Sequence, residues 1–166
     1  MSLKDIDTCL NYGKLYKDIC LNKLKTDDLS MKIEKHKEIL KEVLDEIESA
    51  LKDNRGLVSH QRRLAFSLSL GSVNLIEIYL RTLDVMKEGS KINHMWFKRK
   101  NDTIKDYMQK QITVPLRSVA DIDKIIEIAF KIEEKRDDLA YGAPSTEKLL
   151  QEKINLFFEL KKVVKC

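Results

Sequence analysis

The fold is decided by the stretch LAFSLSLGSV at positions 64–73, where nearly every side chain is apolar or small. A helix without a polar face is usually the buried centre of a helical bundle. Helical spacing of apolar residues extends from position 59 to Glu88, and Gly89 and Ser90 then end the pattern. We therefore predict a long central helix over residues 59–88.

Two amphipathic helices are predicted before this centre. Apolar residues recur at helical spacing over residues 5–24 and again over residues 27–51. Thr26-Asp27-Asp28 is expected to break the first helix and to cap the second, because acids are favourable at the positive end of a helix. We expect residues 1–58 to form an N-terminal helical pair that packs on the rest of the chain.

Three further helices are predicted after the centre. The first covers residues 94–109, with an interruption at Asn101-Asp102, and a loop follows it. The second opens at Ser118-Val119-Ala120-Asp121, which has the character of a capping box, and it ends at Tyr141. The third follows a cap at Ser145-Thr146-Glu147 and has a buried apolar face.

The composition is typical of a helical protein with one core. The 166 residues are 43% hydrophobic and include only 5 Gly and 2 Pro, so turn signals are few. No stretch alternates apolar and polar residues as a strand does. The predicted fold class is all-α: an up-and-down antiparallel bundle of about six helices, with residues 59–166 as its core.

The cysteines and the hydropathy indicate a reducing compartment. Cys9, Cys20 and Cys166 are odd in number and form no CxxC pair, which argues against a disulfide framework and a thiolate zinc site. No apolar run approaches the roughly 20 residues that cross a bilayer, and charged residues stand where a signal peptide would be apolar. We expect a cytoplasmic protein without a membrane partner.

Motifs for metals, nucleotides and nucleophilic catalysis are missing. His36, His60 and His94 lie far apart in the sequence and form no HExxH pair. His36 lies among charged residues and is expected to be solvated, and His60 is expected at a helix start. The five glycines are scattered, which excludes a P-loop or a Rossmann phosphate loop, and no serine has a GxSxG context. We predict no metal and no cofactor.

The net charge is concentrated in one basic segment. Residues 87–110 contain 7 basic and 3 acidic residues, and the difference, 7 − 3 = +4, equals the formal charge of the whole chain. Its candidate binding residues are His94, Trp96, Lys98, Arg99 and Lys100. Bases can stack on aromatic rings while cations neutralise phosphates, which favours a nucleic-acid site. The alternative is that Trp96 anchors the core and the three cations simply face water.

A second constellation precedes the predicted loop at Gly142. Arg136 is followed directly by Asp137 and Asp138, and Tyr141 comes shortly after them. An arginine beside two acids can belong to a structural ion-pair network. It can also be a phosphate-binding arginine tuned by its acidic neighbour. Both interpretations remain open at this point.

Two regions of the chain resemble the HEPN superfamily of small helical-bundle proteins. The first runs from Arg62 to Arg81 and on through Gly89 to His94, and it is similar to the family's long central helix, its turn and the His that opens the next helix. The second runs from Arg136 through Gly142 into the final helix, and it is similar to the family's Arg-containing signature. The resemblance covers residues 60–166.

The resemblance implies a site, but one that lacks a central element. In catalytic members of the family, an Arg, a polar residue and a His a few positions further on form a metal-independent ribonuclease site. Arg136 and Asp137 match the first two elements, whereas Tyr141 lies where the His is implied. A tyrosine hydroxyl is a poor base at neutral pH. One literal match to the spacing, from Arg55 to His60, lies upstream of both regions.

Three functions follow from these observations. The favoured one is a non-catalytic HEPN-like module that binds RNA or a nucleotide, or that partners a nucleotidyltransferase in an antitoxin-type pair. The alternatives are a toxin-type, metal-independent endoribonuclease that uses Arg136, and a structural helical protein-interaction domain. The resemblance also implies a homodimer. The predicted site residues are Arg136, Asp137, Tyr141, His94, Trp96, Lys98, Arg99 and Lys100.

Overall fold

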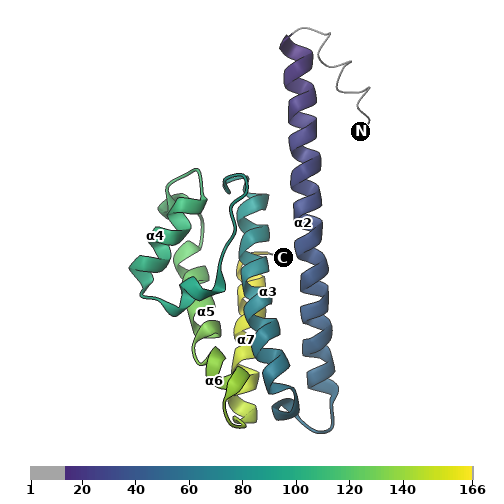
Figure 1. Ribbon diagram of the computed structural model, residues 1–166, viewed down its shortest axis with the longest axis vertical. Coiled ribbons are helices and arrows are strands. Elements are labelled where there is room, and N and C mark those ends of the chain that lie inside the picture. The colour runs from purple at the N-terminus through teal and green to yellow at the C-terminus, as the bar shows by residue number, and fades with distance from the viewer. Residues whose placement is uncertain (1–13, 166) are drawn as a thin grey trace. The chain divides into compact units, whose positions relative to one another are not determined.

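The computed structural model describes the backbone of residues 14–165 and the side chains of residues 32–165 (Figure 1). Within this range the protein consists of α-helices and short 3-10 turns, and one isolated antiparallel bridge joins Met86 to Ile112. The chain divides between Lys35 and His36 into two compact units. The predicted all-α helical bundle is confirmed.

The helix α2 (Lys14–Lys52) is continuous through Thr26, Asp27 and Asp28, so the predicted break and cap at these residues are wrong. No Gly or Pro lies between positions 14 and 52, and Thr and Asp each cost a helix at most about 0.7 kcal/mol relative to alanine. This cost does not end a helix whose flanks are good helix formers. The predicted helical residues 5–13 lie outside the described residues.

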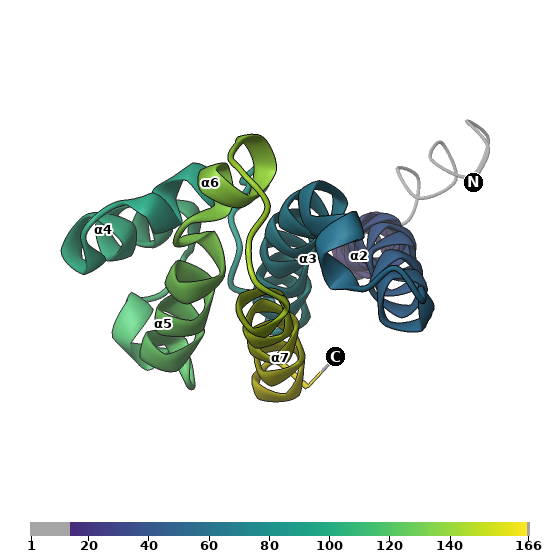
Figure 2. The same cartoon turned by 90° about the horizontal axis from the view of Figure 1, so that it is seen from below.

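The second compact unit contains α2 from His36 onward and the helices that follow it. These helices are α3 (Gln61–Thr82), α4 (Asn101–Gln111), α5 (Ile122–Glu133), α6 (Arg136–Tyr141) and α7 (Glu147–Val163). Figure 2 shows α3 and α7 in the middle of this unit, with α5 and then α4 on one side. Because α3 contacts α5, α6 and α7, it is the central helix.

α3 is the central helix that its apolar sequence predicts, but Phe66 and Leu70 of the apolar stretch are exposed. Leu64 and Leu75 have no exposed surface. At Gly71, an added Cβ would lie 2.6 Å from the Phe157 ring of α7 and 2.9 Å from a methyl carbon of Val43 on α2. Carbon atoms do not pack this closely. The missing side chain at position 71 therefore allows three helices to meet.

α3 ends at Thr82 and not at the predicted Glu88. Asp84 has a left-handed φ of 53°, and the backbone N–H of Val85 donates to the carbonyl of Leu80 at 3.1 Å. This is the hydrogen-bond pattern of a Schellman C-cap. Asp is one of the few residues that adopt the left-handed conformation at modest cost, so it can end the helix where no glycine is present.

The single helix predicted up to Tyr141 is divided into α5 and α6. Lys135, between them, has a left-handed φ of 60°. The buried ammonium of Lys153, on α7, donates hydrogen bonds to the carbonyls of Lys131 and Glu134. It thereby satisfies carbonyl groups that the end of α5 leaves without helical partners. A buried lysine from a distant segment thus stabilises a break that local sequence does not reveal.

The predicted capping box at Ser118 is wrong. Ser118 lies in a short 3-10 turn, η3 (Leu116–Ser118), and its hydroxyl donates to the carbonyl of Pro115 at 2.7 Å. α5 begins after Asp121, which makes no side-chain cap. By contrast, the predicted cap of the last helix is confirmed, because Thr146 Oγ1 accepts a hydrogen bond from the backbone N–H of Leu149 at 3.2 Å.

The basic segment is only partly α-helical. It begins with a 3-10 turn, η2 (His94–Lys98), and continues as α4. The interruption predicted at Asn101-Asp102 therefore falls slightly earlier, at Arg99-Lys100. A further 3-10 turn, η1 (Leu57–His60), leads into α3. Among the described residues, no helix is both long enough and apolar enough to span a membrane.

Candidate functional site

Arg136, Asp137 and Lys98 come together where α6 meets η2. Asp137 Oδ1 accepts a hydrogen bond from Arg136 Nη1 at 2.9 Å, and its Oδ2 accepts one from Lys98 Nζ at 2.6 Å. The side chains of the two cations are 13% and 22% exposed, whereas that of Asp137 is 56% exposed. The hydrogen bond from Lys98, and then that from Arg136, lowers the pKa of Asp137. A carboxylate thus bridges two cations at the surface, as a phosphate group can.

Arg136 also stacks on Phe66, which is not among the site residues predicted from the sequence. The guanidinium carbon lies 4.6 Å from the centre of the Phe66 ring, and the Tyr141 ring meets Phe66 edge to face with 5.9 Å between the centroids. Phe66 is 42% exposed and Tyr141 is 71% exposed. Phe66 belongs to the apolar stretch of α3, where sequence alone does not separate exposed from buried positions.

A cavity of about 320 Å³ lies at the junction of η2, α5 and α6. Its lining residues are Phe97, Lys98, Phe130, Glu133, Glu134, Lys135, Arg136, Asp137 and Asp138. Three of these residues are cations and four are acids, so the cavity has no net positive charge. An anion would therefore be held here by short-range hydrogen bonds from Lys98 and Arg136 and not by a general electrostatic attraction.

His94 lies beside a buried carboxylate. Glu133 is 2% exposed and accepts a hydrogen bond from the Ser69 hydroxyl. The second oxygen of Glu133 lies 3.5 Å from His94 Nδ1, and within the described part of the chain neither atom has a partner with hydrogen-bond geometry. The His94 side chain is 35% exposed. An acid behind a partly exposed imidazole can orient the ring for proton transfer.

Trp96 pairs with an aromatic residue of α4. The rings of Trp96 and Tyr107 have centroids 5.5 Å apart and planes inclined by 32°, and Lys110 Nζ lies 5.6 Å from the centre of the Tyr107 ring. Both rings are half-buried, whereas the neighbouring Phe97 has no exposed surface. Phe97 therefore anchors η2 in the core, while Trp96 keeps an accessible part.

Arg99 and Lys100 connect η2 to α4 and are both exposed. Neither forms an ion pair with another described residue, in contrast to Lys98 and Lys105 of the same segment, which pair with Asp137 and Asp123. Unpaired cations beside accessible rings are suited to contact a polyanion. All eight predicted residues thus lie on η2, α6 or the short link to α4, and Phe66 and Tyr107 join them.

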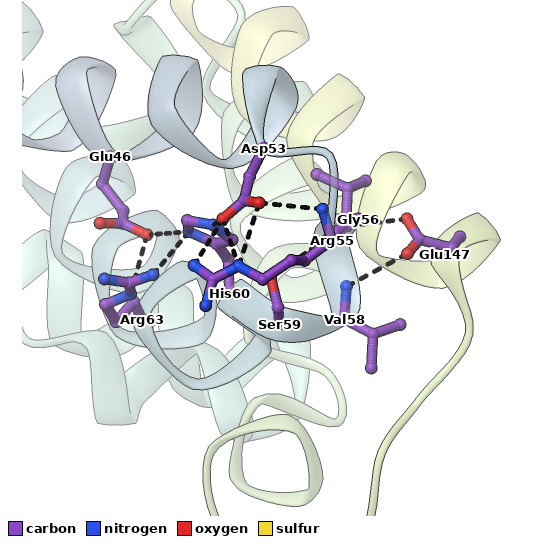
Figure 3. A network of polar contacts seen from close by, with 10 residues as sticks. Glu46, Asp53, Arg55, Gly56, Val58, Ser59, His60, Arg63 and Glu147 are labelled. Carbon is purple, nitrogen blue, oxygen red and sulfur yellow. Dashed lines mark hydrogen bonds and ion pairs between the residues drawn. The ribbon is translucent and has the colours of Figure 1, made fainter.

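The literal Arg-to-His spacing belongs to a structural network (Figure 3). His60 is 2% exposed; its Nε2 lies 2.8 Å from Asp53 Oδ2 and its Nδ1 lies 3.0 Å from Glu46 Oε1. Arg55 donates hydrogen bonds to both oxygens of Asp53, which lowers the pKa of that carboxyl far below its ordinary value. Arg55 and His60 are thus both bound to Asp53, the residue directly after α2, and His60 also contacts Glu46 of α2. These contacts fasten the turn between α2 and α3.

The same turn is joined to α7 by Glu147 (Figure 3). The carboxylate of Glu147 accepts hydrogen bonds from the backbone N–H groups of Leu57 at 3.0 Å and Val58 at 3.3 Å. Gly56 has a left-handed φ of 83°, and an added Cβ there would lie 2.4 Å from Glu147 Oε1. A side chain at position 56 would strain the left-handed backbone and shift the Glu147 carboxylate, so this turn favours glycine.

A second buried polar network surrounds His36, and the prediction that His36 is solvated is wrong. His36 Nδ1 lies 2.6 Å from Asn74 Oδ1, and Nε2 lies 3.1 Å from Glu77 Oε2. The amide nitrogen of Asn74 donates to the carbonyl of Leu70, which turns Oδ1 toward the ring. Both ring nitrogens therefore face acceptors, as an imidazolium requires.

Glu77 is the hub of this network. It is 5% exposed and accepts hydrogen bonds from the backbone N–H of Ile92 at 2.7 Å and from Arg81 Nη2 at 3.3 Å, in addition to its contact with His36. Burial alone would raise the pKa of Glu77, but donors, His36 first among them, outweigh burial and lower it. The hydrogen bond to Glu77 raises the pKa of His36. This network fastens α2 and the segment before η2 to α3.

No protein-family model, curated protein or solved structure matches the chain. The resemblance to the HEPN superfamily therefore stays a prediction. The fold and the contacts described above define an all-α helical bundle that has an aromatic and cationic surface on η2, α4 and α6.

Proposed function

We propose that the protein is a non-catalytic module that binds RNA through Trp96, Tyr107, Arg99 and Lys100. The observation that carries this proposal is the Trp96–Tyr107 ring pair beside two exposed cations that no acid within the described residues neutralises. Proteins hold unpaired RNA by stacking bases on accessible rings while cations contact the phosphates. A free nucleotide would be a smaller ligand of the same surface.

The proposal includes membership of the HEPN superfamily. The central helix α3 and the signature beginning at Arg136 support it, together with the position of His94 at the start of η2. The exposed Tyr141 at the position of the signature His favours binding over cleavage. On this reading the protein is a cytoplasmic homodimer that can partner a nucleotidyltransferase in an antitoxin-type pair.

The affinity for RNA is expected to fall steeply as salt is added. If three phosphates are neutralised, a plot of log affinity against log salt should have a slope of about −2 for a single strand. Trp96→Ala should weaken binding by about 1–3 kcal/mol, the contribution of one stacked base. Fluorescence anisotropy of a labelled RNA in EDTA, at several salt concentrations, measures both quantities.

Matched charge variants provide the control for this prediction. Arg99→Gln/Lys100→Gln should reduce the steepness of the salt dependence by about 0.7 for each lost phosphate contact. Lys148→Gln/Lys162→Gln removes the same charge from exposed positions of α7 and should leave the slope unchanged. Equal slopes for the two double variants would show that the η2–α4 link does not contact RNA, and the proposal would then fail.

A second function, metal-independent RNA cleavage, is favoured by the buried Glu133 behind His94. In this scheme Arg136 binds the phosphate, and His94 accepts the proton of the 2′-hydroxyl. The 2′-oxygen then bonds to phosphorus, the bond from phosphorus to the 5′-oxygen breaks, and a water molecule protonates the 5′-oxygen. His94 would thus supply the base that the signature lacks.

The same assay tests cleavage. If the second function holds, His94→Gln should slow cleavage by about 10²–10⁴-fold without loss of binding, because only proton transfer is removed. Arg136→Ala should abolish cleavage and weaken binding. A thermal melt of each variant establishes that it is folded. Wild-type protein that binds RNA in EDTA and leaves it intact would contradict the second function and leave the first in place.

A further inference from the structure

Two pairs of aromatic rings are linked through Lys98, Asp137 and Arg136. The first pair is Trp96–Tyr107, with Lys110 over the Tyr107 ring, and we call it the α4 platform. The second pair is Phe66–Tyr141, which we call the α3 platform. Each platform keeps accessible ring surface: Trp96 and Tyr107 are half-buried, Phe66 is 42% exposed and Tyr141 is 71% exposed.

Two cations join the platforms. Lys98 follows Trp96 on η2 and donates to Asp137 at 2.6 Å, and Arg136 donates to the same carboxylate at 2.9 Å. Arg136 then stacks on Phe66 at 4.6 Å. Lys98 lies two residues after Trp96 on η2, and every other step from one platform to the other is a direct contact. Figure 2 shows α6, which carries Arg136 and Tyr141, between α4 and α3.

More positive charge lies beyond the α3 platform. Arg62 precedes Phe66 by one turn of α3, so the two side chains share a face of the helix. Arg62 also lines a cavity of about 300 Å³, together with Arg63, Ser59 and Gly142, which follows Tyr141. The described residues that line this cavity include no acid. Cations thus lie between the two platforms and beyond the α3 platform, and Asp137 lies between Lys98 and Arg136.

We infer that the surface holds one single strand across both platforms, with a base stacked on each and the sugar–phosphate backbone over Lys98 and Arg136. This inference rests on the proposed function and adds Phe66, Tyr141 and Arg62 to the binding surface. Rings with cations between them suit single strands, because every base has a face that can stack. A duplex keeps its bases paired inside the helix, where these rings cannot reach them.

Asp137 sets a condition on this path. Its exposed carboxylate is ion-paired with both Lys98 and Arg136, whose side chains are mostly buried. A phosphate that binds both cations must therefore displace this carboxylate. Asp137→Asn removes the competing charge and keeps the size of the side chain. This variant should bind the single strand more tightly than wild-type protein, because the two cations are then free for phosphate.

The test compares a single strand of about 12 nucleotides, which can cover both platforms, with one of about 4 nucleotides, which covers only one. Tyr141→Ala should weaken binding of the longer strand by roughly 5- to 150-fold, the loss of one stacked base, and should have little effect on the shorter strand. Tyr141→Phe keeps the ring and should bind like wild-type protein. A blunt duplex of the longer strand should bind less tightly than the strand itself.

The outcomes separate this inference from the proposed function. If Trp96→Ala weakens binding of the longer strand and Tyr141→Ala does not, the two-platform path is overturned and the RNA-binding function stands. If neither variant has an effect, both are overturned. If Tyr141→Ala changes the mass of the protein in sedimentation without changing its affinity for the strand, the α3 platform is a contact between copies of the chain, and the inference is overturned.

Discussion

Glu77→Ala is expected to lower the free energy of unfolding by about 3–5 kcal/mol, because removing one partner of a buried ion pair leaves the other charges uncompensated. The carboxylate of Glu77 is 5% exposed and contacts the ring of His36, the guanidinium of Arg81 and the backbone N–H of Ile92. After the substitution, His36 Nε2 and the backbone N–H of Ile92 would lose the acceptor that Glu77 provides. The Arg81 guanidinium would lose its buried counter-charge and keep the Ser90 carbonyl as an acceptor at 2.8 Å. Urea denaturation followed by circular dichroism measures the loss.

The control for Glu77→Ala is Glu88→Ala, at an exposed position between α3 and η2. Exposed substitutions of this kind usually change stability by no more than about 0.5 kcal/mol. Glu77→Gln keeps one oxygen for Ile92 but loses the charge, so its effect should lie between those of the other two variants. A loss for Glu77→Ala as small as that for Glu88→Ala would contradict the network around Glu77.

Phe157→Ala is expected to cost about 3–5 kcal/mol, which is typical of truncating a buried aromatic side chain. Phe157 has no exposed surface and lies against Gly71 at the meeting point of α2, α3 and α7. The adjacent Phe158 is half-buried, so Phe158→Ala should cost clearly less and serves as the control. Chemical denaturation of the two variants gives the comparison.

The cavity left by Phe157→Ala should also change the effect of Gly71→Ala. In the wild-type protein the added methyl group would lie 2.6 Å from the Phe157 ring, and such overpacking typically costs about 1–3 kcal/mol. Without that ring the closest contact is removed, and the contact with Val43 at 2.9 Å remains. The two substitutions should therefore couple favourably by about 0.5–3 kcal/mol in a double-mutant cycle. If the free-energy costs of the two substitutions simply added, the close approach of the Phe157 ring to position 71 would be contradicted.

The helical class and the central position of α3 could be predicted because apolar residues at positions 64–73 leave α3 no polar face. The helix boundaries could not be predicted where distant side chains decide them. Lys153 stabilises the break after Glu134 from another helix, and its position in the sequence carries no sign of this role. The break predicted at Thr26-Asp27-Asp28 does not occur, because residues that favour caps do not end a helix by themselves.

The candidate site was partly visible in the sequence. The clustering of Trp96 and the cations after it is local and could be predicted, and the structure also brings Lys98 to Asp137. Phe66 could not be identified, because its exposure depends on where α6 lies against α3. The spacing from Arg55 to His60 suggested a catalytic pair, but in the structure both residues are bound to Asp53, directly after α2.

The ring of His36, which faces acceptors at both nitrogens, links folding to the uptake of a proton. Its pKa in the folded protein lies above the ordinary value of 6.5, so the folded chain keeps this proton at pH values where the unfolded chain has lost it. The stabilisation by this group is complete below the unfolded pKa and disappears as the pH rises through the folded pKa. Between these two values, unfolding releases a proton to the buffer. The enthalpy that a calorimeter records for this protein near neutral pH therefore includes the heat of protonating the buffer and differs from one buffer to another.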